Sequence, residues 1–338
     1  MRLLRPLLNW DGLLAALVVL GLTYATLAVP NFATGFNISQ ALAGISEKAL
    51  LVLPMALLMI TREIDLSVAS MLALTSVVLG ALIQADVALP LAIAAALMTG
   101  AAAGLVNGVL VTRLGLSSLV VTLGTMALFR GLGYVILGPS SVNVLPDALT
   151  DFGINTLGPI LPWTMLPFLV LAPFFVVLLH FTPTGRRIYA IGGNPDAARY
   201  SGVNARRIRL MLFVVSGVVS AVAGIVFTAR LSNARADNAI GFELDVITVA
   251  LLGGINVFGG RGNYVGVFCA LALIATLRNV LGLSQIGGDA QGIVIGLLLI
   301  VSLLASNVVQ RILATVQWRN TVRAQQRDTA TAGTTRSP

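Results

Sequence analysis

The chain has 338 residues, of which 57% are hydrophobic and only 10% are charged, and its mean hydropathy is +0.95. This composition excludes a soluble globular protein. The net charge of +8 does not indicate nucleic acid as a partner, because all but one of the 21 basic residues are arginines and most of them lie outside the apolar runs.

Ten apolar runs are long enough, or nearly so, to cross a bilayer as helices, which takes roughly 20 residues each. The first run imitates a signal peptide, but it is long for a signal core and Asp11 stands at its start, so we expect an uncleaved first span. In chain order the runs are 12–29, 40–60, 66–84, 89–112, 116–137, 162–180, 208–229, 244–258, 263–283 and 290–309.

These runs predict an all-α polytopic membrane protein of about ten transmembrane helices. A short N-terminal segment, 1–11, precedes a single transmembrane domain, 12–310, and a basic tail, 311–338, has a composition typical of disorder. The second run contains two charges and the eighth is short and rich in glycine. A count of eight spans would also leave both termini on one side of the membrane.

The distribution of charge predicts that both termini lie in the cytoplasm. With ten spans, sixteen of the 21 basic residues fall in cytoplasmic segments, and only Arg230 and Arg235 fall in outside loops. Arginine-rich loops are retained on the cytoplasmic side, so this asymmetry favours the orientation.

The loop 181–207 is the most polar part of the predicted domain, and residues 182–209 hold six arginines and one acid, Asp196. Asn194 is a good N-cap, Pro195 suits a first helical position and Gly202 suits a left-handed C-cap, so the sequence predicts a short surface helix over 195–201. Ala197 and Ala198 are small enough to dock into a cleft of another protein. A plain cytoplasmic loop explains the same residues equally well.

Charges inside the spans are candidates for function. Glu47 and Lys48 are about 100° apart on a helix and do not pair with each other, so near the outer end of their span we expect them to reach the interface. Arg130 and Arg278 lie within spans, where they could contact a polar substrate or form structural hydrogen bonds. No acid stands at the midpoint of a predicted span, which argues against an ion-coupled carrier.

Residues needed for several enzyme chemistries are missing from the sequence. Lys48 is the only lysine and does not follow a glycine-rich loop, so the chain has no phosphate-binding P-loop. His180 and Cys269 are the only residues of their kinds, which argues against a zinc cluster or a disulfide within the chain. We expect a protein that is not an enzyme and binds no metal or cofactor itself. Gly259–Gly262 predicts a tight turn.

In several segments, the chain resembles the permeases of ribose-type bacterial ABC sugar importers. The resemblance rests on segments that run in order along the chain: Ile64–Ser70 (IDLSVAS), Val121–Met126 (VTLGTM), Gly185–Arg199 (GRRIYAIGGNPDAAR), and Glu243–Asp245 followed by Leu252–Gly262. One departure is Thr61–Glu63, where such permeases commonly have small residues and glycines. The stretch 232–245 looks more like the rhamnose or autoinducer-2 branch.

The resemblance implies a subunit of the bacterial inner membrane, surrounded by lipid, that carries a ribose- or rhamnose-like sugar or autoinducer-2. The implied partners are a cytosolic ATP-binding cassette subunit, which holds ATP and Mg, a second permease copy or paralogue, and an external sugar-binding protein. It also implies that the loop helix couples to the ATPase. The residues implied in coupling are Gly192, Gly193, Asn194, Pro195, Asp196, Ala197, Ala198, Arg199 and Gly202.

Two further sets of residues are candidates for function. Polar residues that could line a translocation path are Asn107, Thr122, Thr125, Arg130, Asn256 and Arg278, although the two threonines also suit helix packing. Residues expected to face outward, and so to dock the binding protein, are Arg230, Arg235, Asp237 and Glu243. The alternatives are an ion-coupled secondary carrier for a small polar solute, and a membrane-embedded enzyme, for which we find no catalytic cluster.

Overall fold

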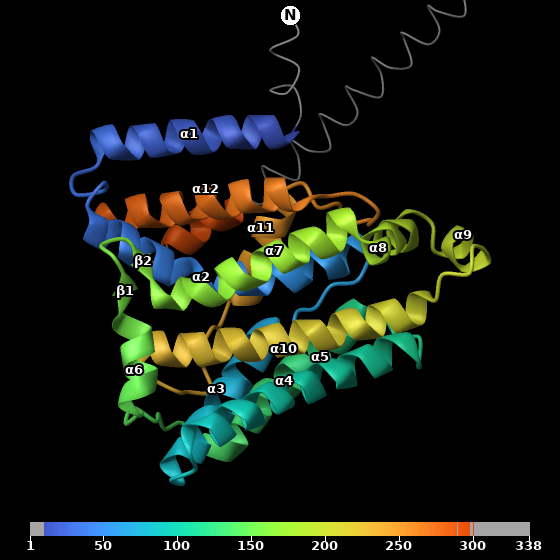
Figure 1. The fold of residues 1–338 in the computed structure, drawn as a ribbon, viewed down its shortest axis with the longest axis horizontal. Helices are drawn as coiled ribbons and strands as arrows, with labels where there is room; N and C mark the ends of the chain where they lie inside the picture. The colour runs from blue at the N-terminus through green and yellow to red at the C-terminus, as the bar shows by residue number, and fades with distance from the viewer. Residues whose placement is uncertain (1–9, 289, 298–299, 301–338) are drawn as a thin grey trace, which may run out of the picture. The chain divides into compact units, whose positions relative to one another are not determined.

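The structure is a computed structural model that describes residues 10–288, 290–297 and 300. In this part of the chain nearly all regular structure is helical (Figure 1). The helices are α1 (Trp10–Ala28), α2 (Gly35–Ile60), α3 (Val68–Gln84), α4 (Leu89–Thr112), α5 (Ser118–Leu137), α6 (Asp147–Ile154), α7 (Leu166–Phe181), α8 (Pro183–Gly193), α9 (Pro195–Tyr200), α10 (Ala205–Leu231), α11 (Phe242–Leu252) and α12 (Tyr264–Leu283). A short 3-10 helix, η3 (Trp163–Met165), and a two-stranded antiparallel pair, β1 (Thr156–Leu157) with β2 (Leu161–Pro162), connect α6 to α7.

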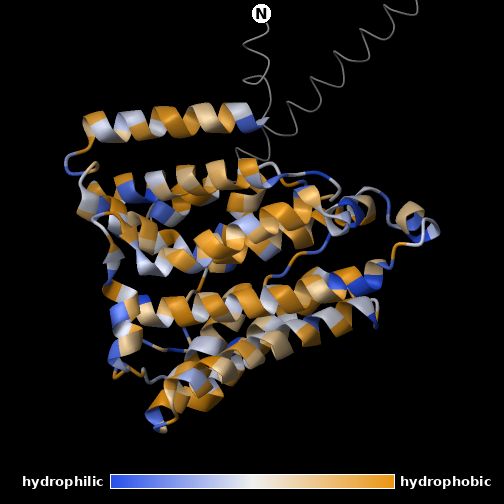
Figure 2. Cartoon of the chain, in the orientation of Figure 1, coloured by the Kyte–Doolittle hydropathy of each residue, from blue (hydrophilic) through white to orange (hydrophobic). Residues whose placement is uncertain are grey.

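Helix α2 forms the core of the bundle, and 94% of an apolar stretch of 18 residues in this helix is buried inside the protein. It packs against α10, α11, α7 and α12, and every residue from Ile45 to Ile60 is buried. The other long helices are also largely apolar, as their orange colour in Figure 2 shows, and in α1, α4, α5, α7 with η3, and α12 at most 33% of the apolar stretch is buried. A water-soluble protein could not expose such surface, whereas a lipid environment suits it.

Small residues let α4 and α10 pack closely. Gly100, Gly104 and Gly108 recur every four residues on α4 and face the backbone of α10, where Gly217 in turn faces α4. A Cβ at Gly100, Gly104 or Gly217 would collide with a main-chain oxygen of the other helix. Because lipid tails are as apolar as leucine, helices in membranes associate through such close van der Waals packing rather than through a hydrophobic driving force.

The number of spans differs from the predicted ten within the described residues. Seven helices there are long and apolar enough to cross a membrane, if η3 and α7 are counted as one helix of 19 residues (Trp163–Phe181), and α3, with 17 residues, is slightly shorter. The expected eighth span, 244–258, is wrong, because α11 ends at Leu252 after 11 residues, about 16 Å. Glycine-rich turns follow it. Residues 290–297 of the expected tenth span are helical. Residues 298–299 and 301–309 of that span, the segment 1–9 and the tail 311–338 lie outside the described residues.

The connections between helices gather at two opposite ends of the bundle. Figure 1 shows α6, β1 and β2 at one end of the long helices and α8 and α9 at the other. The arginine-rich segment therefore stands opposite the short strand pair. Arg230, one of the predicted docking residues, lies near the end of α10 that is away from α9, so it and the predicted coupling loop are at opposite ends of that helix.

Candidate functional site

The arginine-rich segment folds into two short helices, α8 and α9, each begun by a capping side chain. The Thr182 hydroxyl accepts a hydrogen bond from the Gly185 N–H at 3.3 Å. The Asn194 Oδ1 accepts from the N–H groups of Asp196 and Ala197 at 3.1 and 3.0 Å. These side chains satisfy backbone donors that have no partner within the helix.

The predicted surface helix is confirmed to within one residue, since α9 runs from Pro195 to Tyr200. Gly202 has a φ of +79°, the left-handed conformation expected of a C-cap glycine. Asn204 then caps α10 by accepting a hydrogen bond from the Arg207 N–H at 3.0 Å. These helix caps could be predicted from the sequence because each depends on one residue and its close neighbours.

Helix α9 exposes a different face from the one expected. Ala197 is exposed, but Ala198 is only 4% exposed and packs against the protein itself, so the expectation that both alanines dock into a partner is wrong for Ala198. Tyr200 is 92% exposed and was not among the predicted residues. A large aromatic side chain open to solvent at the end of a polar helix is typical of a contact surface. The sequence offers one indication of this role for Tyr200, namely that an aromatic residue stands next to Arg199.

Exposed arginines surround α9. Asp196 is an exposed acid among five exposed arginines. These are Arg186 and Arg187 on α8, Arg199 on α9, and Arg206 and Arg207 on α10. Arginines in the first turn of α10 oppose its helix dipole, so they do not stabilise that helix. The charge of this surface suits an acidic partner.

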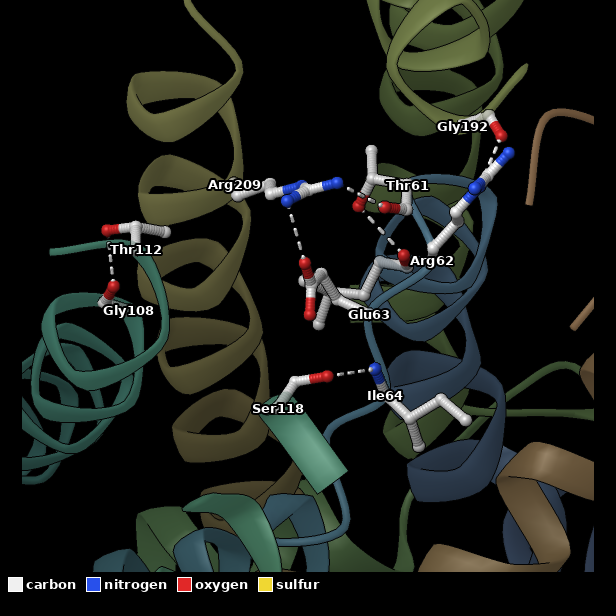
Figure 3. A network of polar contacts seen from close by, with 10 residues as sticks. Thr61, Arg62, Glu63, Ile64, Gly108, Thr112, Ser118, Gly192 and Arg209 are labelled. Carbon is white, nitrogen blue, oxygen red and sulfur yellow. Dashed lines mark hydrogen bonds and ion pairs between the residues drawn. The ribbon is translucent and has the colours of Figure 1, made fainter. Parts of the chain in front are cut away.

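The end of α8 is fastened to the connection between α2 and α3, residues 61–67 (Figure 3). The Arg62 Nε donates to the Gly192 carbonyl at 2.7 Å, and its Nη2 donates to the Gly193 carbonyl at 2.8 Å. The Gly260 N–H donates to the Ile60 carbonyl at 2.9 Å, so the predicted tight glycine turn at 259–262 lies against the same place. Gly192, one of the predicted coupling residues, is buried here and packs against the backbone of Ile60 and Gly260.

The α2–α3 connection is also fastened to α10. The Arg209 Nη1 lies 3.1 Å from the Glu63 Oε1, and the Arg209 Nη2 donates to the Thr61 carbonyl at 3.2 Å (Figure 3). Burial raises the pKa of the Glu63 carboxyl, and the Ser118 hydroxyl and Arg209 oppose that rise. Arg62 and Arg209 therefore join one short connection to the two helices that flank α9.

Next along the connection lies a fully buried polar cluster. Asp65 Oδ1 accepts from the N–H and hydroxyl of Ser67, and Oδ2 accepts from the Ser216 hydroxyl at 2.9 Å. Burial raises the pKa of Asp65, and these hydroxyls oppose the rise. The Asn107 amide donates to the Ser67 hydroxyl at 2.7 Å, so this predicted path residue is part of the buried cluster. The cluster joins the connection to α4 and α10.

Most of the other predicted path residues make structural contacts. Thr122 and Thr125 are buried and donate to main-chain carbonyls. Arg130 Nη1 donates to the carbonyls of Ala236 and Asn238 at 2.7 and 2.6 Å, which is the structural alternative that the sequence left open. Asn256 Oδ1 accepts from the Phe258 N–H within a turn.

The charges of α2 are buried in ion pairs, and the expectation that they reach the membrane interface is wrong. Because α2 begins at Gly35, Glu47 and Lys48 stand at the middle of a 26-residue helix. Glu47 Oε1 lies 2.7 Å from the Arg230 Nε. Asp245 Oδ2 lies 2.7 Å from both the Lys48 Nζ and the Arg278 Nη2. We call these three residues the Asp245 triad.

The predicted path residue Arg278 borders a cavity. A cavity of about 210 Å³ between α2 and α12 is lined by Arg278 together with Gln40 and Asn279 among others. Asn279 and Asn37 exchange hydrogen bonds between their amides at 2.8 and 2.9 Å. This cavity gathers hydrogen-bonding side chains beside the Asp245 triad.

The four predicted docking residues have different environments. Arg235 and Asp237 form a partly exposed pair with each other, with two hydrogen bonds of 2.8 Å. Arg230 is held by Glu47, and the Glu243 Oε2 is buried. Of the four, Arg235 and Asp237 are the most open to a partner. In the described part of the chain, no group of three His, Cys, Asp or Glu residues could hold a metal ion.

Comparison with known proteins gives consistent relatives over most of the chain. Residues 37–303 match the family model described as branched-chain amino acid transport system / permease component. The chain is 36% identical over 306 residues to the ribose import permease protein RbsC of Escherichia coli (strain K12), covering 89% of this chain and 94% of that protein.

Two other relatives are named for substrates other than ribose. The chain is 35% identical over 311 residues to the L-arabinose transport system permease protein AraH of the same strain, covering 91% of this chain and 94% of that protein. It is 34% identical over 292 residues to the autoinducer 2 import system permease protein LsrD of Yersinia enterocolitica, covering 84% and 86%. No solved structure matches the chain.

Proposed function

The chain belongs to the family of branched-chain amino acid transport system permease components, and from that premise we propose that it moves a monosaccharide into the cytoplasm with energy from a separate ATPase. It is a multi-pass permease of the inner membrane. The relatives named for ribose, arabinose and autoinducer-2 favour a small polyhydroxylated substrate over a branched-chain amino acid. We propose a ribose- or rhamnose-like sugar or autoinducer-2.

The surface of α9 is the observation that carries this proposal. A helix of six residues, capped at its start, presents Tyr200 and Ala197 among exposed arginines at one end of the bundle. We propose that this is the cytoplasmic end, because arginines are retained there. An ATPase that grips α9 and closes on ATP would move it, and α8 and α10 would carry the movement to the α2–α3 connection.

The proposed assembly has further subunits. A second copy of this chain or a paralogue completes the pathway, and an external sugar-binding protein delivers the substrate to the opposite end, where Arg235 and Asp237 are partly exposed. ATP and Mg belong to the ATPase. An ion-coupled carrier is less well supported, because the acid at the middle of α2, Glu47, is held by Arg230 at 2.7 Å.

A bulky substitution on the exposed face of α9 tests the proposal. We expect Ala197→Trp to insert in the membrane normally, because Ala197 is exposed, but to lose at least tenfold in the ATPase that co-purifies with the tagged chain. Ala85→Trp is the matched control, because Ala85 is also exposed but follows α3 at the end away from α9. Equal ATPase recovery with both variants would contradict the coupling role of α9.

A further inference from the structure

Arg62 joins the α2–α3 connection to the backbone directly before α9. Its guanidinium donates to the carbonyls of Gly192 and Gly193, at 2.7 and 2.8 Å. Asn194, the next residue, caps α9. A displacement of α9 must therefore act on the two carbonyls that Arg62 holds. Because an arginine fork presents donors in a fixed planar geometry, it can hold both carbonyls at once.

The backbone of Arg62 adopts a conformation that suits glycine. Its φ is +68°, in the left-handed region, where a Cβ meets steric hindrance that glycine avoids. The Arg62 N–H still donates to the Met59 carbonyl at 3.0 Å, and the next N–H donates to the Leu58 carbonyl at 3.0 Å, so the turn that ends α2 is intact. A glycine would keep this turn and remove the side chain alone.

The neighbours of Arg62 fasten the other side of α9. Glu63 pairs with Arg209 in the second turn of α10, and the Thr61 carbonyl accepts from the same guanidinium. The consecutive residues Thr61, Arg62 and Glu63 thus bind both α8, which precedes α9, and α10, which follows it. Beyond them, the connection leads to the buried Asp65 cluster and into α3.

We propose that Arg62 is a positioning residue that transmits the displacement of α9 to the α2–α3 connection, and that its loss uncouples transport from ATP hydrolysis. This inference rests on the proposed function, since it takes an ATPase on α9 as the source of movement. Arg62 touches neither ATP nor sugar in this account. It acts through the carbonyls of Gly192 and Gly193, which it binds to the core of the bundle.

The test compares Arg62→Gly with the unaltered chain in the complex that co-purifies with its ATPase. Hydrogen exchange is followed in two peptides, one covering α9 and one covering residues 61–67, before and after ATP is added. We expect ATP to change exchange in both peptides of the unaltered complex. In Arg62→Gly we expect the change at α9 to remain and the change at 61–67 to disappear.

Transport gives a second readout. For whichever of D-ribose, L-arabinose, L-rhamnose and autoinducer-2 the unaltered complex takes up, we expect Arg62→Gly to move about tenfold less substrate for each ATP hydrolysed. Arg62→Lys, whose ammonium is a point charge rather than a fork, should restore part of the coupling. Arg113→Gly is the matched control, because Arg113 is exposed and directly follows α4, and we expect it to behave as the unaltered chain.

The outcomes separate the two proposals. If Arg62→Gly keeps the ATP-dependent change at 61–67 and the normal substrate moved for each ATP, Arg62 is not the transmitting residue, although the proposed function stands. If ATP leaves α9 unchanged in the unaltered complex, the proposed function fails and the role of Arg62 falls with it. If Arg62→Gly fails to fold, the same measurements on Arg62→Lys decide, and unchanged coupling there contradicts the proposal.

Discussion

Gly192 and Gly193, which are adjacent at the end of α8, differ in the space that is available for a side chain. Gly192 lies against the Ile60 carbonyl and the Gly260 backbone, so that an added Cβ would overlap main-chain atoms on both sides. Gly193 has open space where its Cβ would be. Neither has a positive φ, so backbone strain does not distinguish them. The difference is one of packing, because an added Cβ would enter the contact with the end of α2 at Gly192 but not at Gly193.

We expect Gly192→Ala to destabilise the protein by about 1 to 3 kcal/mol, the usual cost of forcing extra volume into packed backbone. Gly193→Ala is the matched control and should leave stability within about 0.5 kcal/mol of the unaltered chain. Thermal unfolding of the two purified variants in the same detergent measures the difference. Equal melting temperatures would show that α8 does not rest on Ile60 as described.

The energetics of Arg62 can be judged at the same scale. A left-handed conformation costs a residue other than glycine about 1 to 2 kcal/mol. Hydrogen bonds that involve a charged group contribute about 1.5 to 3 kcal/mol each, and Arg62 makes two with the α8 carbonyls. The two bonds are therefore large enough to offset the backbone cost, which explains why an arginine is stable in this turn.

At the scale of elements, α11 is the helix that departs most from expectation. It has 11 residues and begins after Gly241, which has a φ of +86°. Asp245, in its first turn, is held by Lys48 of α2 and Arg278 of α12. The Lys48 Nζ also lies 4.3 Å from the centre of the Phe242 ring. The Asp245 triad thus fixes the start of α11 between two long helices.

Removing the carboxylate from the Asp245 triad should be costly. Asp245→Asn would leave two cations facing each other in a site where the Lys48 side chain is 6% exposed, and breaking such a buried pair costs about 3 to 5 kcal/mol. Asp237→Asn breaks a pair whose side chains are 43% and 37% exposed, which should cost at most about 1 kcal/mol. Thermal unfolding should rank the variants in that order. The reverse order would contradict the structural role of the triad.

At the scale of the whole molecule, short connecting elements lie at both ends of the long helices (Figure 1). The arginines around α9 occupy one end and the α6 and β1–β2 connection occupies the other (Figure 1). Between them, the core helix α2 is linked by ion pairs to α10 and α11 near its middle and through Arg62 to α8 at its end. These contacts form a continuous series of packed, hydrogen-bonded elements between α9 and the middle of the bundle, along which the proposed movement would pass.

The sequence predicts those features that depend on neighbouring residues. Apolar runs locate most of the long helices, and Asn194, Pro195 and Gly202 locate α9, because capping needs only adjacent positions. It also predicts the family, from motifs that occur in order along the chain. The end of α11 is missed because the apolar run continues past Leu252, although the glycines there turn the chain.

Contacts between distant residues could not be predicted in the same way. Arg62 and Gly192 are separated by 130 positions, and Glu47 and Arg230 by 183. Nothing in the local pattern of either partner specifies the other, so Glu47 and Lys48 were assigned to the interface. The buried side of Ala198 is missed for the same reason, since α9 is too short for hydrophobic periodicity to show which face is covered.

The most direct test of the account is uptake by reconstituted vesicles. The chain is placed in lipid vesicles alone, or together with the ATPase and sugar-binding protein that co-purify with it, and radiolabelled D-ribose, L-arabinose, L-rhamnose and autoinducer-2 are offered in turn. We expect one of these substrates to accumulate only when both partners and ATP are present. Accumulation by the chain alone, driven by an ion gradient, would contradict the account.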